Sequence, residues 1–243
     1  MPDKQRVSFA RQLVSEAVGT AFLLAAVVGS GIMGERLSAG NVAIALLANT
    51  IATGAMLVAL ILTFGPISGA HLNPAVTLVD AWQRGIAWRR VPGYIAAQTA
   101  GAFLGVASAN LMFGAPMFAA SHHARAGGAQ IFSEFIATFG LVAVIWGCVR
   151  LRSSAIPFAV GAYITSAYWF TASTSFANPA VTPARSVTDT FTGIRPVDVP
   201  GFLVAQLAGA IAATALFAWL APSLSTQAAA VLIPHNRGRE NNN

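Results

Sequence analysis

Long apolar stretches, separated by short polar segments, occupy most of this chain. Six of them have about the length that a helix needs to cross a bilayer about 30 Å thick, over residues 9–33, 41–64, 91–113, 129–150, 154–173 and 199–221. Two further stretches, over about 73–83 and 178–188, are too short to cross. The first long stretch follows Lys4, Arg6 and Arg11 without a convincing cleavage site, so we expect a retained helix. The pattern predicts an all-α membrane protein with six transmembrane helices and two half-helices.

The composition agrees with a membrane protein. The 243 residues are 56% hydrophobic and 9% charged, whereas soluble domains carry about 25% charged residues. A net charge of +6 can indicate a nucleic-acid partner, but the charges cluster at the ends of the apolar stretches. The expected partner is therefore the lipid bilayer and not nucleic acid. The single cysteine, Cys148, excludes an internal disulfide.

The charges also predict an orientation, because cytoplasmic loops are enriched in Lys and Arg. With the N-terminus inside, ten of the 14 Lys and Arg residues are cytoplasmic: Lys4, Arg6, Arg11, Arg84, Arg89, Arg90, Arg150, Arg152, Arg237 and Arg239. The other four, which fall outside, are Arg36, Arg125, Arg185 and Arg195. We therefore expect a multi-pass protein of the cell (inner) membrane. Both termini, including the polar tail 234–243, should be cytoplasmic.

Each short stretch begins with the same three residues, Asn-Pro-Ala. Asn is a good N-cap, and Pro suits the first helical position because its missing N–H would have no partner there. A helix that begins in mid-membrane is costly unless its free N–H groups face a water-filled cavity. Two such starts predict two half-helices that point their positive ends at one polar pore. The residues expected at its constriction are Asn73, Pro74, Ala75, Asn178, Pro179 and Ala180.

The motif belongs to a longer internal repeat. Two further pairs of segments resemble each other: Ser15–Thr20 with Ser133–Thr138, and Val91–Ala102 with Val199–Ala210. Each half, about 9–115 and about 128–221, predicts two spanning helices, a half-helix and a third spanning helix. Three crossings in each half make the second copy inverted in the membrane. We expect a single channel domain over residues 1–243.

The order of these motifs resembles that of the aquaporin (major intrinsic protein) family. The motifs are Glu-x-x-x-Thr, then Gly-x-x-Ser-Gly-Ala-His-x-Asn-Pro-Ala-Val-Thr, then a second Asn-Pro-Ala in a duplicated six-span chain. The resemblance covers about residues 9–221. It implies a homotetramer in which each subunit has its own pore. It also implies passive conduction of water or small uncharged solutes without a cofactor.

Several polar residues have an expected place in such a pore. Asn73 and Asn178 should cap their half-helices with the side-chain oxygen and donate from the amide to a permeating oxygen. Glu16 and Glu134 lie within spanning segments, where acidic residues usually have partners. They are either proton-relaying or structural, and their repetition favours structural carboxylates that accept backbone N–H groups. The resemblance suggests that His71 lines the cytoplasmic half of the pore, and a packed loop histidine is the alternative.

The clearest departure from the family is Val181, three residues after the second Asn, where aquaporins carry an Arg. An Arg there donates to the solute, narrows the pore and adds positive charge. Arg185 is about one turn farther toward the mouth, so we expect it to guard the entrance without replacing that Arg. Pro183 should crowd the carbonyl of Pro179 and remove a helical hydrogen bond. The second half-helix is therefore predicted to be kinked or short.

Three further positions complete the expected selectivity filter. Thr53 is the second-helix position, where water-selective members carry an aromatic residue, and Ser175 is the third position. The fifth-helix position has two candidates. Counting back from the second motif without a gap gives Ser166 and a wide, hydroxyl-lined filter. Anchoring on Gly161 gives Tyr168, which partly occludes the filter.

The sequence therefore predicts a channel with a widened filter that lacks the usual Arg. The expected solutes are water, glycerol-like polyols and undissociated metalloid acids such as arsenite. Arsenite is included because Val at the Arg position resembles a bacterial subgroup associated with arsenic resistance.

Two other function classes fit the sequence less well. An ion- or proton-coupled transporter with inverted repeats would need coupling sites, for which Glu16 and Glu134 are the available carboxylates. A scaffold with a closed pore would leave the polar Asn-Pro-Ala pair unexplained. No nucleophile–base set is visible, so we expect no enzyme. The pair His122–His123 is a weak metal signal, and no metal site is predicted.

Overall fold

The computed structural model describes residues 7–151 and 153–220, which form helices and loops without any strand. The α-helices are α1 (Phe9–Leu37), α2 (Val42–Ser68), α3 (Pro74–Trp82), α4 (Val91–Met112), α5 (Gly128–Leu151), α6 (Ile156–Phe170), α7 (Val181–Ala184) and α8 (Val199–Leu220). Short 3-10 helices are η1 (Trp88–Arg90), η2 (Ser153–Ala155), η3 (Arg185–Val187) and η4 (Pro196–Asp198). The predicted all-α membrane fold is confirmed.

The spanning helices follow the predicted apolar stretches, with one exception. Among the described helices, α1, α2, α4, α5 and α8 are long and apolar enough to cross a membrane. α6 has 15 residues, whereas the sequence predicts a span over 154–173. The 3-10 helix η2 lies directly before α6, and Thr171, directly after it, is extended. At 1.5 Å per residue α6 is about 22 Å long, less than the bilayer core.

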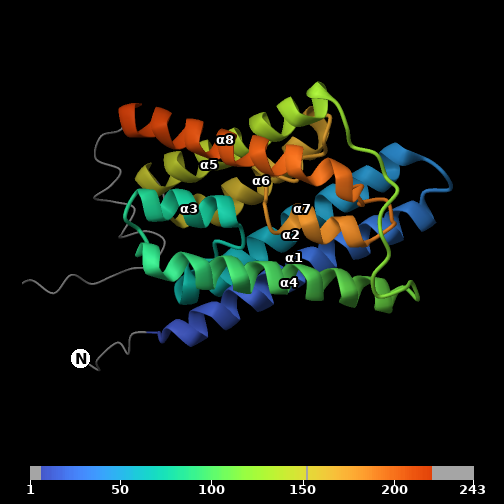
Figure 1. Cartoon of the computed structure of the whole chain (residues 1–243), viewed down its shortest axis with the longest axis horizontal. Coiled ribbons are helices and arrows are strands. Elements are labelled where there is room, and N and C mark those ends of the chain that lie inside the picture. The colour runs from blue at the N-terminus through green and yellow to red at the C-terminus, as the bar shows by residue number, and fades with distance from the viewer. Residues whose placement is uncertain (1–6, 152, 221–243) are drawn as a thin grey trace, which may run out of the picture.

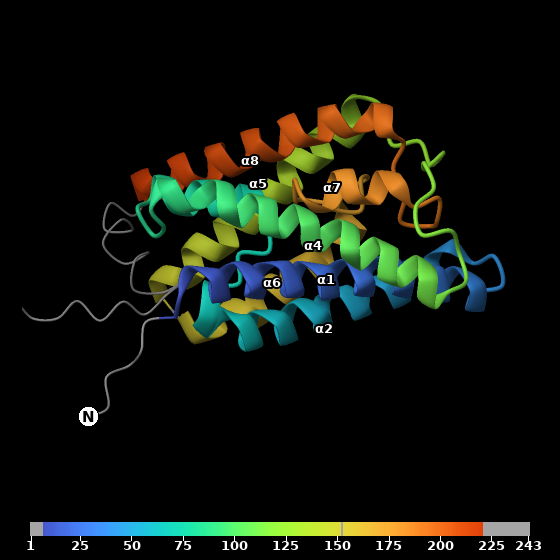
Figure 2. The same cartoon turned by 60° about the horizontal axis from the view of Figure 1, so that its bottom comes forward.

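The helices of the two halves pack in corresponding ways. In the first half α1 packs against α2 and α4, and in the second half α5 packs against α6 and α8. Contacts between α2 and α6 join the halves. Figures 1 and 2 show these helices running roughly along one direction, as a bundle. Such packing is what two three-helix repeats of opposite orientation would give.

The two half-helices lie toward opposite ends of this bundle. α3 is toward the left end of Figure 1 and α7 toward the right, and each contacts both α4 and α8. α3 covers most of its predicted stretch, 73–83. α7 has four residues and continues into η3, although the sequence predicts a half-helix over 178–188. Pro183 explains the shortening, because it donates no hydrogen bond to the carbonyl of Pro179 and crowds it.

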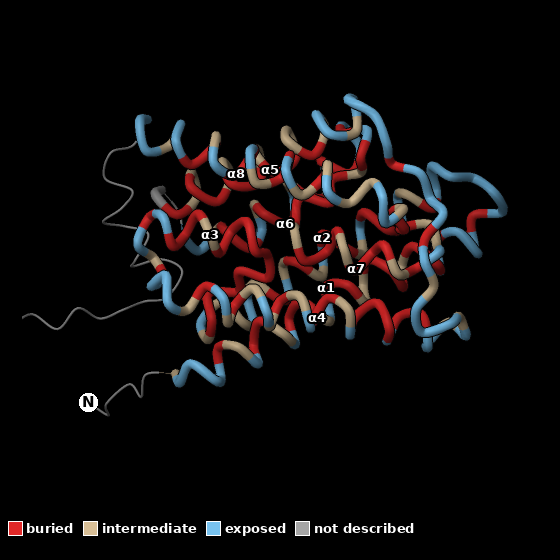
Figure 3. The backbone as a smooth tube through the Cα atoms, in the orientation of Figure 1, coloured by how far each residue is buried: buried red, intermediate tan, exposed pale blue. Residues whose placement is uncertain are grey.

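The distribution of side chains is that of a membrane protein. Large apolar residues are exposed on the outer faces of the spanning helices, among them Val14, Phe22, Ile51, Leu104 and Val204. Polar side chains are fully buried between the helices, among them Glu16, Gln98, Glu134 and Gln206. Figure 3 shows the buried parts of the backbone at the centre of the bundle. Lipid suits this surface, because hydrocarbon offers no partner to polar groups.

The chain enters and leaves the bundle at the same end. The start of α1, the end of α8 and the start of α4 all lie toward the left of Figure 1. The start of α4 follows η1, which contains Arg89 and Arg90. Of the positions that we expect on the cytoplasmic side, Lys4, Arg6, Arg152, Arg237, Arg239 and the tail 234–243 lie outside the described residues.

Two glycines at equivalent places in the repeat allow close helix contacts. A Cβ added at Gly101 of α4 would overlap the carbonyl oxygen of Ala17 in α1. A Cβ at Gly209 of α8 would overlap the carbonyl oxygen of Phe135 in α5. Glycine lets two membrane helices approach closely. These contacts bring α4 close to α1, which carries Glu16, and α8 close to α5, which carries Glu134.

We expect Gly101→Ala to lower the free energy of unfolding by about 1–3 kcal/mol, the usual cost of overpacking. Thermal unfolding of the purified protein in detergent measures the change. Gly147→Ala in α5 is the matched control, because its added Cβ would meet the Phe217 ring at an ordinary 3.8 Å. Since Ala favours helix over Gly, the control should be neutral or slightly stabilising. Equal effects at the two positions would contradict close packing at Gly101.

Candidate functional site

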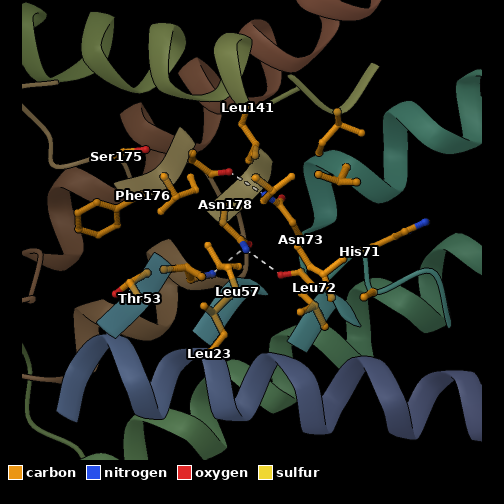
Figure 4. A pocket seen from close by; sticks show the side chains of 18 of the residues that line it. Leu23, Thr53, Leu57, His71, Leu72, Asn73, Leu141, Ser175, Phe176 and Asn178 are labelled. Atoms are coloured by element: carbon orange, nitrogen blue, oxygen red, sulfur yellow. Dashed lines mark hydrogen bonds between the residues drawn. The ribbon is translucent and has the colours of Figure 1, made fainter. Parts of the chain in front are cut away.

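A cavity lies between the two halves, where the loops before α3 and α7 meet. Most of its wall is apolar and includes Leu23, Val27, Leu57, Leu141, Ile145, Val160 and Ile164. The polar side chains of the wall are Thr53, His71, Asn73, Tyr168, Ser175, Asn178 and Arg185. Figure 4 shows Asn73 and Asn178 close together, with Leu23, Leu57 and Leu141 around them. The cavity wall is therefore mostly apolar, with a few hydrogen-bond donors and acceptors.

The two Asn side chains cap the half-helix starts. Asn73 Oδ1 accepts a hydrogen bond from the backbone N of Ala75, at 2.9 Å. Asn178 Oδ1 accepts from the backbone N of Ala180 at 2.9 Å and of Val181 at 3.3 Å. Pro74 is the first residue of α3. Pro179 lies in the turn before α7, so the second cap serves a tight turn as well as a helix.

The same two amides tie the halves together. Asn73 Nδ2 donates to the carbonyl of Ala177, and Asn178 Nδ2 donates to the carbonyl of Leu72, both at 2.8 Å (Figure 4). An amide NH2 has two hydrogens. Each amide therefore keeps one hydrogen for a group inside the cavity, and the Oδ1 caps fix its direction.

The loops before both half-helices have an unusual backbone. Ala70 and Leu72 have φ of 46° and 49°, and Ser175 and Ala177 have φ of 51° and 47°. Residues other than Gly rarely adopt this left-handed conformation, which costs about 1–3 kcal/mol each. The carbonyls of Leu72 and Ala177 accept the Asn bonds in this conformation. Other interactions must compensate for the strain.

Glu16 and Glu134 supply that compensation. The Glu16 carboxylate accepts from the backbone N of His71 at 3.0 Å and of Leu72 at 2.7 Å. The Glu134 carboxylate accepts from the backbone N of Phe176 and of Ala177, both at 2.9 Å. Each carboxylate thus holds the strained loop of its own half. This arrangement matches the structural role that the repeat favours.

Gln98 and Gln206 complete the two networks, although no role was predicted for them from the sequence. Gln98 Nε2 donates to Glu16 at 2.8 Å and to Thr77 Oγ1 at 2.9 Å. Gln206 Nε2 donates to Glu134 at 2.6 Å and to a Thr hydroxyl, that of Thr182, at 2.8 Å. A signal was available, since both glutamines occupy the same place in the repeated Val-Pro-Gly segment.

His71 lines the cavity and is also hydrogen-bonded within its loop. Its Nδ1 lies 3.1 Å from Thr77 Oγ1, and its Nε2 lies 3.5 Å from Asp80 Oδ2. Asp80, on α3, is buried beside it, and no sequence motif singled Asp80 out. Both interpretations of His71, pore-lining and packed, therefore describe part of its surroundings.

Four of the expected filter residues come together at one part of the cavity wall. Thr53, Tyr168, Ser175 and Val181 are all buried and all line the cavity. Tyr168 Oη donates to Thr53 Oγ1 at 3.3 Å, which joins α6 to α2 there. Ser175 Oγ is buried without a hydrogen-bond partner among the described residues. It is one of the hydroxyls available to a ligand in the cavity.

Ser166 is the candidate that the structure corrects. It is exposed on α6 and lies in a shallow outer groove beside Cys148 and Tyr163, away from the cavity. Tyr168 is two residues later and points to the opposite side of the helix, since two residues rotate a helix by about 200°. Ser166 therefore does not line the cavity, whereas Tyr168 does, and the geometry favours Tyr168 as the fifth-helix filter position.

Arg185 differs from the expectation of a residue at the mouth. It is 2% exposed and belongs to the cavity wall, one turn beyond Val181. Its guanidinium lies 3.4 Å from the ring centre of Phe176 and donates from Nε to the carbonyl of Thr192. Arg125, from the loop after α4, is also buried, with its guanidinium 5.0 Å from the same ring. The count of Lys and Arg residues predicted only that both arginines lie on the outer side of the membrane, not that they are buried.

The pair His122–His123 lies in an exposed loop away from the cavity. The ring Nδ1 and the backbone N of His122 each bond to the carboxylate of Asp189 at 2.9 Å. These hydrogen bonds lower the pKa of Asp189, whereas burial, with the nearby Arg125 and Arg185, lowers the pKa of His123. Within the described part of the chain, no group of three or more His, Cys, Asp or Glu could hold a metal ion.

Comparison with known proteins agrees with this geometry. The Major intrinsic protein family matches residues 3–151 and 148–241. The chain is 56% identical over 216 residues to "Aquaglyceroporin AqpS" of Rhizobium meliloti (strain 1021), covering 89% of this chain and 92% of that one. It is 34% identical to "Aquaporin NIP1-1" of Oryza sativa subsp. japonica, covering 85% and 72%.

A solved structure has the same fold. The X-ray structure of the aquaglyceroporin from Plasmodium falciparum superposes with a TM-score of 0.71, at 20% identity, over 90% of this chain and all of that one. The family match spans the chain, and the relatives match over most of their own length. This chain therefore belongs to the major intrinsic protein (aquaporin) family of membrane channels, which are not enzymes.

Proposed function

We propose that this protein is a passive channel for water, glycerol-like polyols and undissociated metalloid acids such as arsenite. The observation that carries the proposal is the pair of half-helix starts, Asn73 and Asn178, which line one apolar cavity and each keep one amide hydrogen for it. Neutral solutes with hydroxyl oxygens can accept these hydrogens. The positive ends of two helix starts oppose cations.

The residues at two filter positions support solutes larger than water. Position 181 carries Val instead of the Arg of the family pattern, and Thr53 stands where water-selective members have an aromatic residue. The relative with 56% identity is called an aquaglyceroporin. Val at position 181 occupies less volume than the Arg of the family pattern, which leaves room for polyols and undissociated acids beside Tyr168. The hydroxyl groups of Thr53, Tyr168 and Ser175 belong to the same cavity wall.

We also propose the assembly and location that the family implies. The chain would form a homotetramer in the cell (inner) membrane, with one pore in each subunit and both termini in the cytoplasm. The exposed apolar helix faces and the arginines near the start of α4 support this arrangement. Cross-linking of the protein in membranes should give a tetramer, and a tag at either end should stay inaccessible from outside intact cells.

A proton-coupled transporter is the second candidate, and one observation favours it. Glu16 and Glu134 each accept hydrogen bonds from two backbone N–H groups and from side chains. Asp80 Oδ1, in contrast, is buried without a hydrogen-bond partner among the described residues. Asp80 also lies beside His71, so this pair could exchange a proton. A passive channel needs no such step, and the two functions are separable by experiment.

Proteoliposome flux distinguishes the two functions. Under an inward glycerol gradient without an ion or pH gradient, we expect vesicles with the protein to shrink and then re-swell faster than empty vesicles. Arsenite at neutral pH, where it is an undissociated acid, should enter in the same way. A flux that requires a pH gradient, or that moves protons with the solute, would replace the channel by the coupled transporter.

A further inference from the structure

Arg185 is a cavity residue that the proposed function has not used. It lies four residues after Val181, and residues four apart on a helical turn share one face. Both side chains consequently line the same cavity. Pro183 ends α7 after one turn, and the 3-10 turn η3 begins with Arg185. The chain therefore carries an arginine one turn beyond the position at which the family pattern has one.

The guanidinium of Arg185 is held in place on two sides. The ring of Phe176 lies against it at 3.4 Å, a cation–π distance, and Nε donates to the carbonyl of Thr192. The backbone carbonyl of Arg185 in turn accepts from the backbone N of Ile194 at 3.3 Å. The two Nη groups make no hydrogen bond to any described residue. They are the donors that a molecule in the cavity would meet.

Arg125, the other buried arginine, differs because its Nε and its Nη1 both donate to backbone carbonyls. Its Nε donates to the carbonyl of Gly193 at 2.8 Å, and its Nη1 donates to the carbonyl of Ser173 at 3.0 Å. It also does not line the cavity. Arg125 therefore ties together the loops that contain Ser173 and Gly193, and Arg185 is the arginine available to a solute.

The absence of an ion-paired carboxylate in the described part of the chain also indicates that the Arg185 guanidinium faces the cavity. Among the residues that the structure describes, no Asp or Glu forms an ion pair with either guanidinium. A buried charge without a counter-ion is costly unless polar groups or water solvate it. For Arg185 the cavity is where such solvation can occur. The positive charge of Arg185 then acts on each solute in the cavity: it favours oxygen acceptors and opposes cations.

We propose that Arg185 is the selectivity arginine of this channel. Its Nη groups donate to a hydroxyl oxygen of a neutral polyol or undissociated acid, together with Ser175 Oγ, and its charge keeps cations out. The inference rests on the proposed channel function and adds a residue to it. Val181 leaves more room than an Arg would at position 181, while Arg185 supplies the hydrogen-bond donors and the positive charge one turn away.

Arg185→Gln and Arg185→Lys in proteoliposomes test the proposal. Arg185→Gln should raise the proton and sodium leak about tenfold, because the positive charge that opposes cations is removed. It should also change the glycerol-to-water flux ratio, because the charge-assisted hydrogen bond to the solute is lost. Arg185→Lys should keep the cation barrier and still change the flux ratio, because Lys cannot stack and donate as Arg does. Arg36→Gln is the control: Arg36 is exposed and contacts the Phe113 ring at 5.2 Å.

Moving the charge tests whether its position matters. Val181→Arg combined with Arg185→Gln should restore the cation barrier that Arg185→Gln loses. Folded Arg185→Gln with the wild-type leak and flux ratio would overturn the proposal. Should that variant not fold, wild-type flux ratios in Arg185→Lys would overturn it. Failure of the channel function itself would look different, because wild-type vesicles would then conduct no glycerol.

Discussion

Replacing Glu134 by Leu should remove most of the folded protein. The change removes the acceptor of the backbone N–H groups of Phe176 and Ala177 and of Gln206 Nε2. Each buried backbone N–H left without a partner costs about 1–3 kcal/mol, so the two together cost about 2–6 kcal/mol. That is a large fraction of a typical total stability of about 5–15 kcal/mol. Size-exclusion chromatography of the solubilised protein and its thermal unfolding measure the loss.

Glu134→Gln separates a structural role from a proton-relaying one. The Gln oxygen can still accept from one backbone N–H, but the charge-assisted bonds are lost. We expect a lower yield of folded protein whose glycerol-to-water ratio is that of the wild type. Glu35→Gln is the control, because Glu35 is an exposed glutamate on α1. Folded Glu134→Gln that loses flux through a pH-dependent step would instead favour proton coupling.

The fold was largely readable from the sequence because two strong signals coincide in it. Apolar length sets the spanning helices, and Asn-Pro marks a helix start in the middle of the membrane. The internal repeat then supplies the topology. The short α6 was not predictable in the same way, because hydropathy does not distinguish a 3-10 turn such as η2 from a turn of α-helix. Pro183 did predict a short α7.

The site was readable where the repeat or a motif marked it, and less so elsewhere. The Asn caps and Glu acceptors occur twice, and their geometry follows from general capping chemistry. The choice between Ser166 and Tyr168 depended on a two-residue gap that no periodicity reveals. Arg125 and Arg185 are buried by loop conformations, including residues with positive φ such as Thr174 and Ser175. Asp80 occurs without a partner in the repeat, so nothing in the sequence pointed to it.

Val181→Arg should shift the channel toward water selectivity. Val181 is buried in the cavity wall, and its backbone N is held by the cap of Asn178, so the side chain at this position extends from a fixed turn. A guanidinium there adds bulk, which excludes polyols and metalloid acids, and charge, which strengthens the cation barrier. We expect glycerol and arsenite flux to fall at least about tenfold more than water flux, a barrier difference of about 1.4 kcal/mol. Stopped-flow light scattering of proteoliposomes measures both fluxes.

Bulk and charge can be separated at this position. Val181→Leu adds volume without charge, so it should lower glycerol flux less than Val181→Arg does and leave the cation leak unchanged. Val76, three residues after Asn73, also lines the cavity and is the repeat equivalent of Val181. Val76→Leu tests whether the same added volume matters equally in the other half.

Equal glycerol-to-water ratios in folded wild type and Val181→Arg would show that position 181 does not limit solute size. The limit would then lie with Tyr168, whose hydroxyl meets Thr53 across the same wall, or with Arg185 one turn beyond.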